Sequence, residues 1–284
     1  MILTHKDWRI IDLINSSTNT LQKYNISNAR LEAEWMLCHV LQCKRIDLYI
    51  NFEQIPHEKN LVQLTKMLKR RLSYEPLQHI IGKGTFYGRD YFVNKNVLVP
   101  RPETELIIEE VKNFGKYNCI LDVGTGSGCL AITISLENLA KNIYATDISE
   151  QALKIAKQNA QAHKVNNIKF KQHDFLNSSF NKKFDIIVCN PPYIAKKNIS
   201  TLDKVVRSFD PHIALSDNLD GLSFYRRFSK LFNKIVNQGG KAILEFGGNK
   251  QKNDIENIFK QNNLKTTFIK DLQHDWRVVI ITNA

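Results

Sequence analysis

The sequence lacks any long apolar run. No hydrophobic stretch among its 284 residues approaches the roughly 20 residues that a membrane-spanning helix requires. The opening residues, MILTHKDWRIID, contain no basic segment followed by an apolar core, so we expect no secretory signal. These two absences favour a cytoplasmic protein without a membrane partner.

Cysteines are few, and none stands in a CxxC pair. The chain has five cysteines, and its eight histidines are scattered without the spacing of metal ligands. This pattern argues against a zinc site and against a disulfide framework, and it predicts reduced thiols packed in the interior. We therefore expect no metal site.

Acidic residues are outnumbered by basic ones, 28 to 40, which gives a net charge of +12. A basic surface suits an acidic partner such as nucleic acid. The excess is spread along the chain and not concentrated in a tail, so an ordinary solvated surface explains it equally well. Nucleic acid is thus not required as a partner, although it stays open as one.

The first part of the chain, residues 1–75, has the periodicity of helices. Thr4 is placed to cap a helix that runs through residues 4–18. Helical spacing recurs twice more. The apolar positions are Leu31, Trp35, Cys38 and Leu41 in one segment, and Leu61, Leu64, Leu68 and Leu72 in the other. Amphipathic helices joined by short loops predict a small N-terminal helical bundle.

Residues 76–102 change character and predict a β-hairpin linker. The stretch is rich in glycine, aromatic and β-branched residues, and we expect its hairpin within residues 79–99. Pro100-Arg101-Pro102 ends the extended segment, and a helix should follow over residues 103–114.

Residues 103–284 alternate between predicted strands and helices. The strands are expected at 117–123, 142–148, 167–173, 184–189, 239–246, 264–271 and 276–282. The helices between them are expected at 129–139, 150–163, 221–236 and 249–261. Strands that are apolar throughout and separated by helices predict an α/β domain with a mostly parallel seven-stranded sheet covered on both faces.

A glycine-rich loop, LDVGTGSGCLAI, lies between the first strand of this domain and its helix. Gly124, Gly126 and Gly128 allow a tight turn and a close approach of the backbone to a ligand. Asp147 ends the next strand, where an acid reaches ribose hydroxyls in doubly wound sheets. Together these features predict a nucleoside-containing cofactor. The glycine spacing differs from the GxGxxG pattern of dehydrogenases.

A second motif, NPPY, follows the strand at 184–189. Asn190 and the Pro191 carbonyl can each accept one N–H of a planar amine, and Tyr193 can stack on that group. Pro191 and Pro192 make the corner stiff. We predict that these four residues are catalytic, through placement of the amine and stabilisation of the positive charge that its nitrogen gains when it attacks an electrophile. Adenine N6, cytosine N4, guanine N2 and a glutamine amide all remain possible acceptors on this motif alone.

The D-x-G-x-G-x-G order resembles the class I methyltransferases of Rossmann-like fold, which bind S-adenosylmethionine. By this resemblance the donor lies on the loop, Asp147 holds its ribose, and Asp174 and Phe175 lie beside its adenine. The resemblance therefore implies S-adenosyl-L-methionine as cofactor, bound by Gly124, Thr125, Gly126, Ser127, Gly128, Asp147, Asp174, Phe175 and Asn190.

From about residue 29 to residue 246, the chain resembles the release-factor glutamine N5-methyltransferases, the PrmC/HemK family. The matching segments are ARLEAEWMLCHVL, RLSYEPLQHIIGKGTFYG, VLVPRPETE, LDVGTGSGCLAI, NPPYI and DGLSFYRRF. The resemblance implies methylation of the glutamine in the Gly-Gly-Gln motif of peptide chain release factors, with residues 1–75 docking that protein and residues 103–284 performing the transfer.

Asp210 stands where the family more often has Glu before Pro, and the glycine usual before Arg277 is missing. Neither departure touches the predicted chemistry. The alternative function is a nucleic-acid amino-methyltransferase that acts on adenine N6 or guanine N2. No base-reading motif accompanies the helical segment, although such enzymes usually need one.

Overall fold

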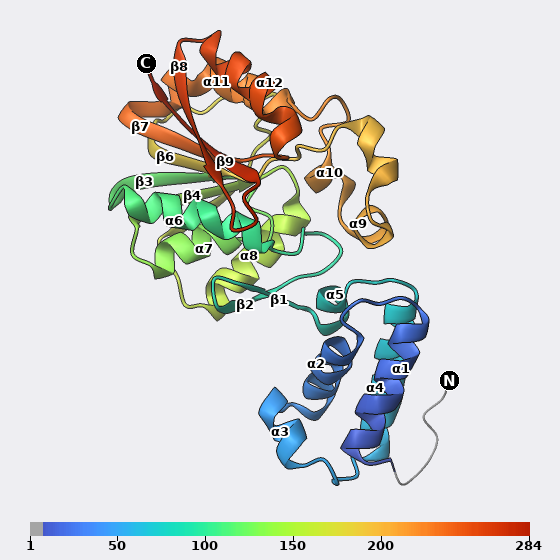
Figure 1. Cartoon of the computed structure of the whole chain (residues 1–284). Helices are drawn as coiled ribbons and strands as arrows, with labels where there is room; N and C mark the ends of the chain where they lie inside the picture. Colours follow the sequence, from blue (N-terminus) through green and yellow to red (C-terminus); the bar gives the residue numbers. More distant parts are fainter. Residues whose placement is uncertain (1–7) are drawn as a thin grey trace. The chain divides into compact units, whose positions relative to one another are not determined.

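The computed structural model describes residues 8–284, which divide into two compact units. Of the described residues, 8–82 form the helical unit and Lys83–Ala284 form the α/β unit (Figure 1). The division lies inside the segment predicted as a linker, residues 76–102, and the predicted domain boundaries stay a prediction.

The helical unit buries one continuous apolar core, to which Leu13, Met36 and Leu64 contribute. Its helices are α1 (Ile10–Lys23), α2 (Ala29–Leu41), α3 (Arg45–Ile50), α4 (Glu58–Leu72) and α5 (Leu77–Ile81). At the start of α1, Asp12 accepts the backbone N–H of Arg9 at 3.2 Å. The predicted Thr4 cap lies outside the described residues.

The predicted apolar face of α2 is wrong. The helix buries Ala33, Met36, Leu37 and Val40, whereas Trp35 is 42% exposed. Apolar residues lie nearly all round this helix, so spacing alone could not select the buried stripe. The face predicted for α4 is largely right, because Leu61, Leu64 and Leu68 are buried.

The predicted hairpin is shorter than residues 79–99. Residues Leu77–Ile81 form α5, whose Leu77 and Ile80 pack into the core of the helical unit, and Gly82 ends that helix with a positive φ of 76°. The hairpin itself consists of β1 (Lys83–Phe86) and β2 (Arg89–Phe92), paired antiparallel. Burial of the two apolar side chains outweighs the extended propensity of this stretch.

The α/β unit contains the predicted seven-stranded sheet. Its strands are β3 (Tyr117–Val123), β4 (Ala140–Asp147), β5 (Ile168–Gln172), β6 (Phe184–Cys189), β7 (Val236–Glu245), β8 (Leu264–Lys270) and β9 (Trp276–Asn283). They lie in the order β5-β4-β3-β6-β7-β9-β8, and β9 is antiparallel to both of its neighbours. This arrangement confirms the fold class expected from the sequence.

Alternate residues of each central strand enter two separate cores. Leu121 of β3 packs on one face with α11 (Ser223–Ile235) and α12 (Asn249–Lys260). Ile120 packs on the other face with helices α6 (Glu105–Asn113) and α7 (Cys129–Leu136). Helix α8 (Glu150–Ala162) joins this second face (Figure 1).

Residues 195–215 form a helical excursion that the sequence did not suggest. It contains η2 (Lys196–Thr201), α9 (Lys204–Phe209) and α10 (His212–Leu215) between β6 and α11. A further short turn, η1 (Pro102–Thr104), precedes α6. Within residues 8–284, no helix is both long and apolar enough to cross a bilayer.

Candidate active site

The glycine loop runs from the end of β3 into α7, at the carboxyl edge of the sheet. Gly124, Gly126 and Gly128 all have positive φ angles, from 55° to 83°, which favour glycine. A Cβ atom at Gly124 would meet nothing within 4 Å, so the space above the loop is open. Beneath it, the Thr125 hydroxyl donates to the buried Asp122 carboxylate at 2.6 Å.

Asp147, at the end of β4, is in direct contact with this loop. Its Oδ2 accepts the Gly126 backbone N–H at 2.9 Å, and its Oδ1 accepts the Ser149 N–H at 2.9 Å. Burial raises the pKa of the carboxyl group. Each oxygen keeps a second lone pair, so the carboxylate can still accept hydroxyl groups of a ligand.

Asp174 and Phe175 follow β5 and line the same pocket. Asp174 accepts the backbone N–H of Leu176 and the side-chain N–H of Asn177, and the Asn177 contact is the main cause of its lowered pKa. Phe175 is buried, and its ring stacks with that of Phe224 at 5.7 Å between centroids. Phe224 also lines the pocket, although no sequence motif indicates it.

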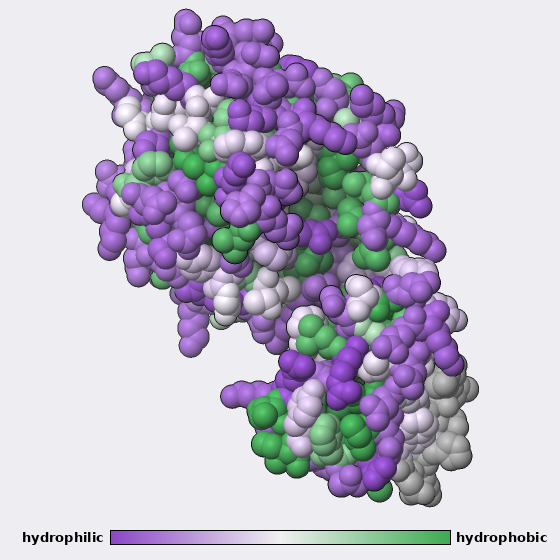
Figure 2. Space-filling model, in the orientation of Figure 1, coloured by the Kyte–Doolittle hydropathy of each residue, from purple (hydrophilic) through white to green (hydrophobic). Residues whose placement is uncertain are grey.

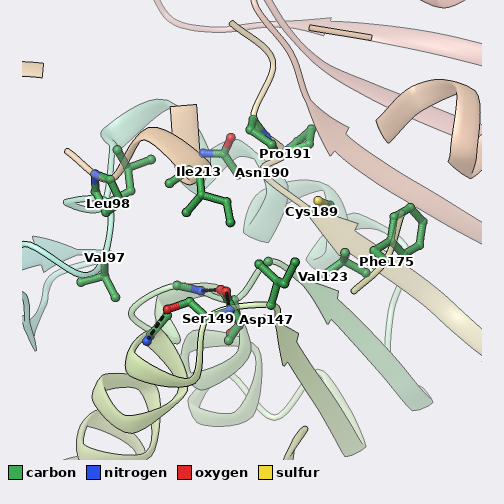
Figure 3. Close-up of a pocket in the computed structure, with 18 of the residues that line it drawn as sticks. Val97, Leu98, Val123, Asp147, Ser149, Phe175, Cys189, Asn190, Pro191 and Ile213 are labelled. Atoms are coloured by element: carbon green, nitrogen blue, oxygen red, sulfur yellow. Dashed lines mark hydrogen bonds between the residues drawn. The ribbon is translucent and has the colours of Figure 1, made fainter. Parts of the chain in front are cut away.

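The NPPY corner reaches the pocket from β6, which is the neighbour of β3. Because Val123 is paired with Cys189, the glycine loop and Asn190 leave adjacent strands at the same edge. Asn190 and Pro191 lie across the cavity from Asp147 and Ser149 (Figure 3). The predicted donor and acceptor residues thus line one cavity.

Apolar side chains close the remaining sides of this cavity. They come from the segment after the hairpin, from the strand ends and from α10; among them are Val97, Leu98, Val123, Cys189 and Ile213 (Figure 3). The hollow beside α10 has hydrophobic walls in the space-filling view (Figure 2). Apolar walls of this kind keep water away from groups that react inside the cavity.

Tyr193 does not line the cavity as the structure describes it. Its ring packs against the core under α11, and its hydroxyl donates to Glu245 Oε1 at 3.2 Å. Burial raises the pKa of the phenol. The stacking role expected for this ring stays a prediction, one that this arrangement does not support.

Two buried residues behind Asn190 were not found from the sequence. Thr104 accepts the Asn190 Nδ2–H at 3.0 Å, and its own hydroxyl donates to Glu245 Oε2 at 2.6 Å. Burial raises the pKa of Glu245 to about 7. The available signal was an acid at the carboxyl end of an apolar strand, together with the PRPETE segment that contains Thr104.

Arg101, which lines the cavity, donates to the Asp210 carboxylate at 2.8 Å. Asp210 is buried, and this burial raises its pKa, while the nearby Arg101 opposes the shift. The ion pair joins the segment before η1 to the end of α9. The contact therefore links the pocket-lining Arg101 to the buried Asp210.

Two family matches cover most of the chain. Residues 12–82 match the PrmC N-terminal domain, and residues 102–210 match the methyltransferase small domain. A solved methyltransferase from Pyrococcus furiosus has the same fold, with a TM-score of 0.53 at 19% identity. That alignment covers 75% of this chain and 95% of the other.

Relatives of higher identity extend over nearly the whole chain. The release factor glutamine methyltransferase of Chlorobaculum tepidum is 36% identical over 84% of this chain and 86% of its own length. That of Bacillus cereus is 36% identical over 89% of this chain and 91% of its own length. The chain therefore belongs to the release factor glutamine methyltransferase family.

Proposed function

We propose that the protein transfers a methyl group from S-adenosylmethionine to the side-chain amide nitrogen, N5, of the glutamine in the Gly-Gly-Gln motif of peptide chain release factors. Family membership supports this substrate. The structural observation that carries the proposal is Asn190, an amide whose Nδ2 is bound by Thr104 at the wall of the donor pocket. Since release factors act on ribosomes, the proposed reaction is cytoplasmic.

The residues of the pocket fit the proposed methyl donor. The loop Gly124–Gly128 leaves open space above Gly124, and Asp147 retains acceptor capacity for ribose hydroxyls. Asp174 and Phe175 are proposed to lie beside the adenine, with Phe224 completing the apolar side. When bound, S-adenosylmethionine supplies an electrophilic methyl group on a sulfonium sulfur.

Asn190 and Pro191 are proposed to place the acceptor amide. The nitrogen of a glutamine amide is a poor nucleophile, because its lone pair is delocalised into the carbonyl group. The Asn190 Oδ1 and the Pro191 carbonyl can each accept one N–H, which aims the lone pair along the line of attack. As the nitrogen gains positive charge, both acceptors bind it more strongly than in the ground state. The proton leaves afterwards, when the nitrogen has become acidic, so no strong base is needed.

The helical unit is proposed to dock the release factor. Apolar surface lies over α3, where Ile46 is 61% exposed and Ile50 is 73% exposed (Figure 2). Exposed apolar side chains close together on a small helical unit suit a protein contact. A nucleic-acid substrate is not favoured, because the relatives of this family are named for release factors.

Mass spectrometry of an intact release factor, after incubation with the enzyme and donor, tests the proposed reaction. We expect one added methyl group on the loop glutamine and none on a release factor whose loop glutamine is replaced by alanine. An Asn190→Ala enzyme serves as the matched control. Methylation of an adenine-containing oligonucleotide, with the release factor left unmodified, would contradict the proposal.

Docking is tested by Ile46→Ser and Ile50→Ser, with Leu272→Ser as control, since Leu272 is 97% exposed in the α/β unit. We expect each helical-unit change to raise KM for the release factor about fivefold, which corresponds to ~1 kcal/mol, with kcat unchanged. An unchanged KM in both variants would reject this docking surface.

A further inference from the structure

A hydrogen-bonded chain of buried side chains runs from the cavity wall into the sheet. Asn190 donates through Nδ2 to Thr104, Thr104 donates to Glu245 Oε2, and Tyr193 donates to Glu245 Oε1. Thr104 and Glu245 are almost fully buried. Among residues 8–284, the Asn190 side-chain oxygen accepts no hydrogen bond, so it is free for a ligand.

The position of Glu245 follows from the sheet register. Strands β6 and β7 are parallel, and Cys189 is paired with Leu244. Asn190, which directly follows β6, therefore lies beside Glu245, the last residue of β7, at the carboxyl edge of the sheet. The Tyr225 hydroxyl donates to the Glu245 backbone carbonyl at 2.7 Å, which fixes the strand end from the side of α11.

We propose that Thr104 and Glu245 are positioning residues that determine which end of the Asn190 amide faces the substrate. The inference rests on the proposed function, because it concerns the acceptor amide of that reaction. An ionised carboxylate can only accept hydrogen bonds, and a threonine hydroxyl has one proton to donate. With that proton donated to Glu245, the Thr104 oxygen must accept from Asn190. The Asn190 Nδ2 is thereby turned to the wall, and Oδ1 is left for the substrate N–H.

Protonation of Glu245 reverses the direction of this chain. The protonated carboxyl donates to Thr104, Thr104 then donates to Asn190 Oδ1, and Nδ2 turns toward the cavity. An N–H group there repels the N–H of the substrate amide. The carboxyl group faces Arg277, which favours its charged form, and Glu103, which opposes it, in addition to Thr104 and Tyr193. Because burial brings its pKa to about 7, the reversal falls in an accessible pH range.

Glu245→Gln and Thr104→Val test the proposal. Glu245→Gln keeps the shape but allows both directions of the chain, and Thr104→Val removes the hydroxyl at nearly constant volume. We expect kcat for release-factor methylation to fall roughly 10- to 100-fold in each variant, by displacement of the acceptor amide. Donor affinity measured by calorimetry should stay within about twofold of the wild type, because the hydrogen-bonded side chains position the acceptor amide and not the methyl donor.

Thr104→Ser keeps the hydroxyl and should restore most of the rate. Thr133→Val is the matched control, since Thr133 is a buried threonine whose hydroxyl is bonded to Tyr91 at 2.8 Å and which does not line the pocket. It should leave kcat unchanged. A loss caused by destabilisation alone would be similar in Thr133→Val and would not be restored by serine at position 104.

The pH profile gives a second readout, which remains available if Thr104→Val fails to fold. In the wild type, kcat should fall as pH drops through about 7, where Glu245 takes up its proton. In Glu245→Gln this acid limb should be absent, and kcat should stay low throughout. This inference alone would be overturned if the wild type methylates the glutamine and Glu245→Gln shows the same kcat and the same acid limb of the pH profile as the wild type. A wild-type enzyme that binds donor but leaves the glutamine unmodified would overturn the proposed function, and this inference with it.

Discussion

Gly126 donates its backbone N–H to the carboxylate of Asp147 across 21 residues of sequence. The contact joins the turn of the glycine loop to the end of β4, and the Ser149 N–H holds the other carboxylate oxygen. Asp147 therefore has two roles that sequence motifs do not separate. It supports the loop from within, and it presents its remaining lone pairs to the pocket.

Asp147→Ala should weaken donor binding by about 1–3 kcal/mol, since an ionised acceptor is lost. Because the Gly126 and Ser149 N–H groups also lose their partner, the melting temperature should fall as well. Isothermal titration calorimetry and thermal melts measure the two effects. Asp147→Asn is the milder control, because it keeps one acceptor oxygen. Unchanged donor affinity in Asp147→Ala would reject the ribose assignment.

Asp122 should make the stability of the α/β unit depend on pH. Burial raises the pKa of this carboxyl group to about 7, and the hydrogen bond from Thr125 offsets only part of that shift. A raised folded-state pKa means that the folded state binds the proton more tightly than the unfolded state. The resulting stabilisation is therefore present at low pH and is lost as pH rises through about 7.

Asp122→Asn removes this titration while keeping the shape. When the pH is changed from 5 to 8, we expect the free energy of unfolding of the variant to rise by about 1–4 kcal/mol relative to that of the wild type. Urea denaturation at both pH values measures the difference. The prediction fails if the free energies of unfolding of the two proteins change in parallel between these pH values.

The Arg101–Asp210 pair should stabilise the α/β unit beside the pocket, which Arg101 lines. Arg101→Ala leaves the buried Asp210 carboxylate without its partner. We expect the free energy of unfolding to fall by roughly 1–3 kcal/mol. The fall is smaller than for a fully buried pair because Arg101 is partly exposed. Adding Asp210→Asn should recover part of the loss, since it removes the uncompensated charge. A double variant as unstable as Arg101→Ala would contradict the charge explanation.

The sheet was predictable because its central strands, β3 and β6, are local apolar runs, and the two motifs were recognisable because their residues are adjacent in sequence. Where one local sequence pattern fits more than one structure, tertiary packing determines which structure forms. Helical spacing places Trp35 on the buried face of α2, which has apolar residues nearly all round, and α5 forms at the start of the segment predicted as a hairpin. The Thr104–Glu245 contact spans 141 residues. Only the register of β6 against β7 brings Glu245 behind Asn190.

Asn190 separates placement from acid–base catalysis. Asn190→Ala removes the side-chain acceptor and should lower kcat on the order of 100-fold or more, by analogy with the loss of one partner of a charge-stabilising site. Donor affinity should change far less, because the lost contact belongs to the acceptor amide and is strongest in the transition state. Single-turnover methylation of the release factor, combined with calorimetry of donor binding, measures both quantities.

Asn190→Asp keeps an acceptor of the same shape and adds a negative charge beside the cationic donor. A general base at this position would hold or raise the rate. We expect the rate to fall instead, because the carboxylate is attracted to the sulfonium in the ground state and shifts the amide out of line. The charge also repels the ionised Glu245, which disturbs the hydrogen bond through Thr104.

Tyr193→Phe should be the mildest change, since it removes one of the two side-chain donors to Glu245 and leaves Thr104 in place. If Tyr193→Phe proved as damaging as Asn190→Ala, the phenol would take part in the chemistry, and placement by Asn190 would not account for the rate.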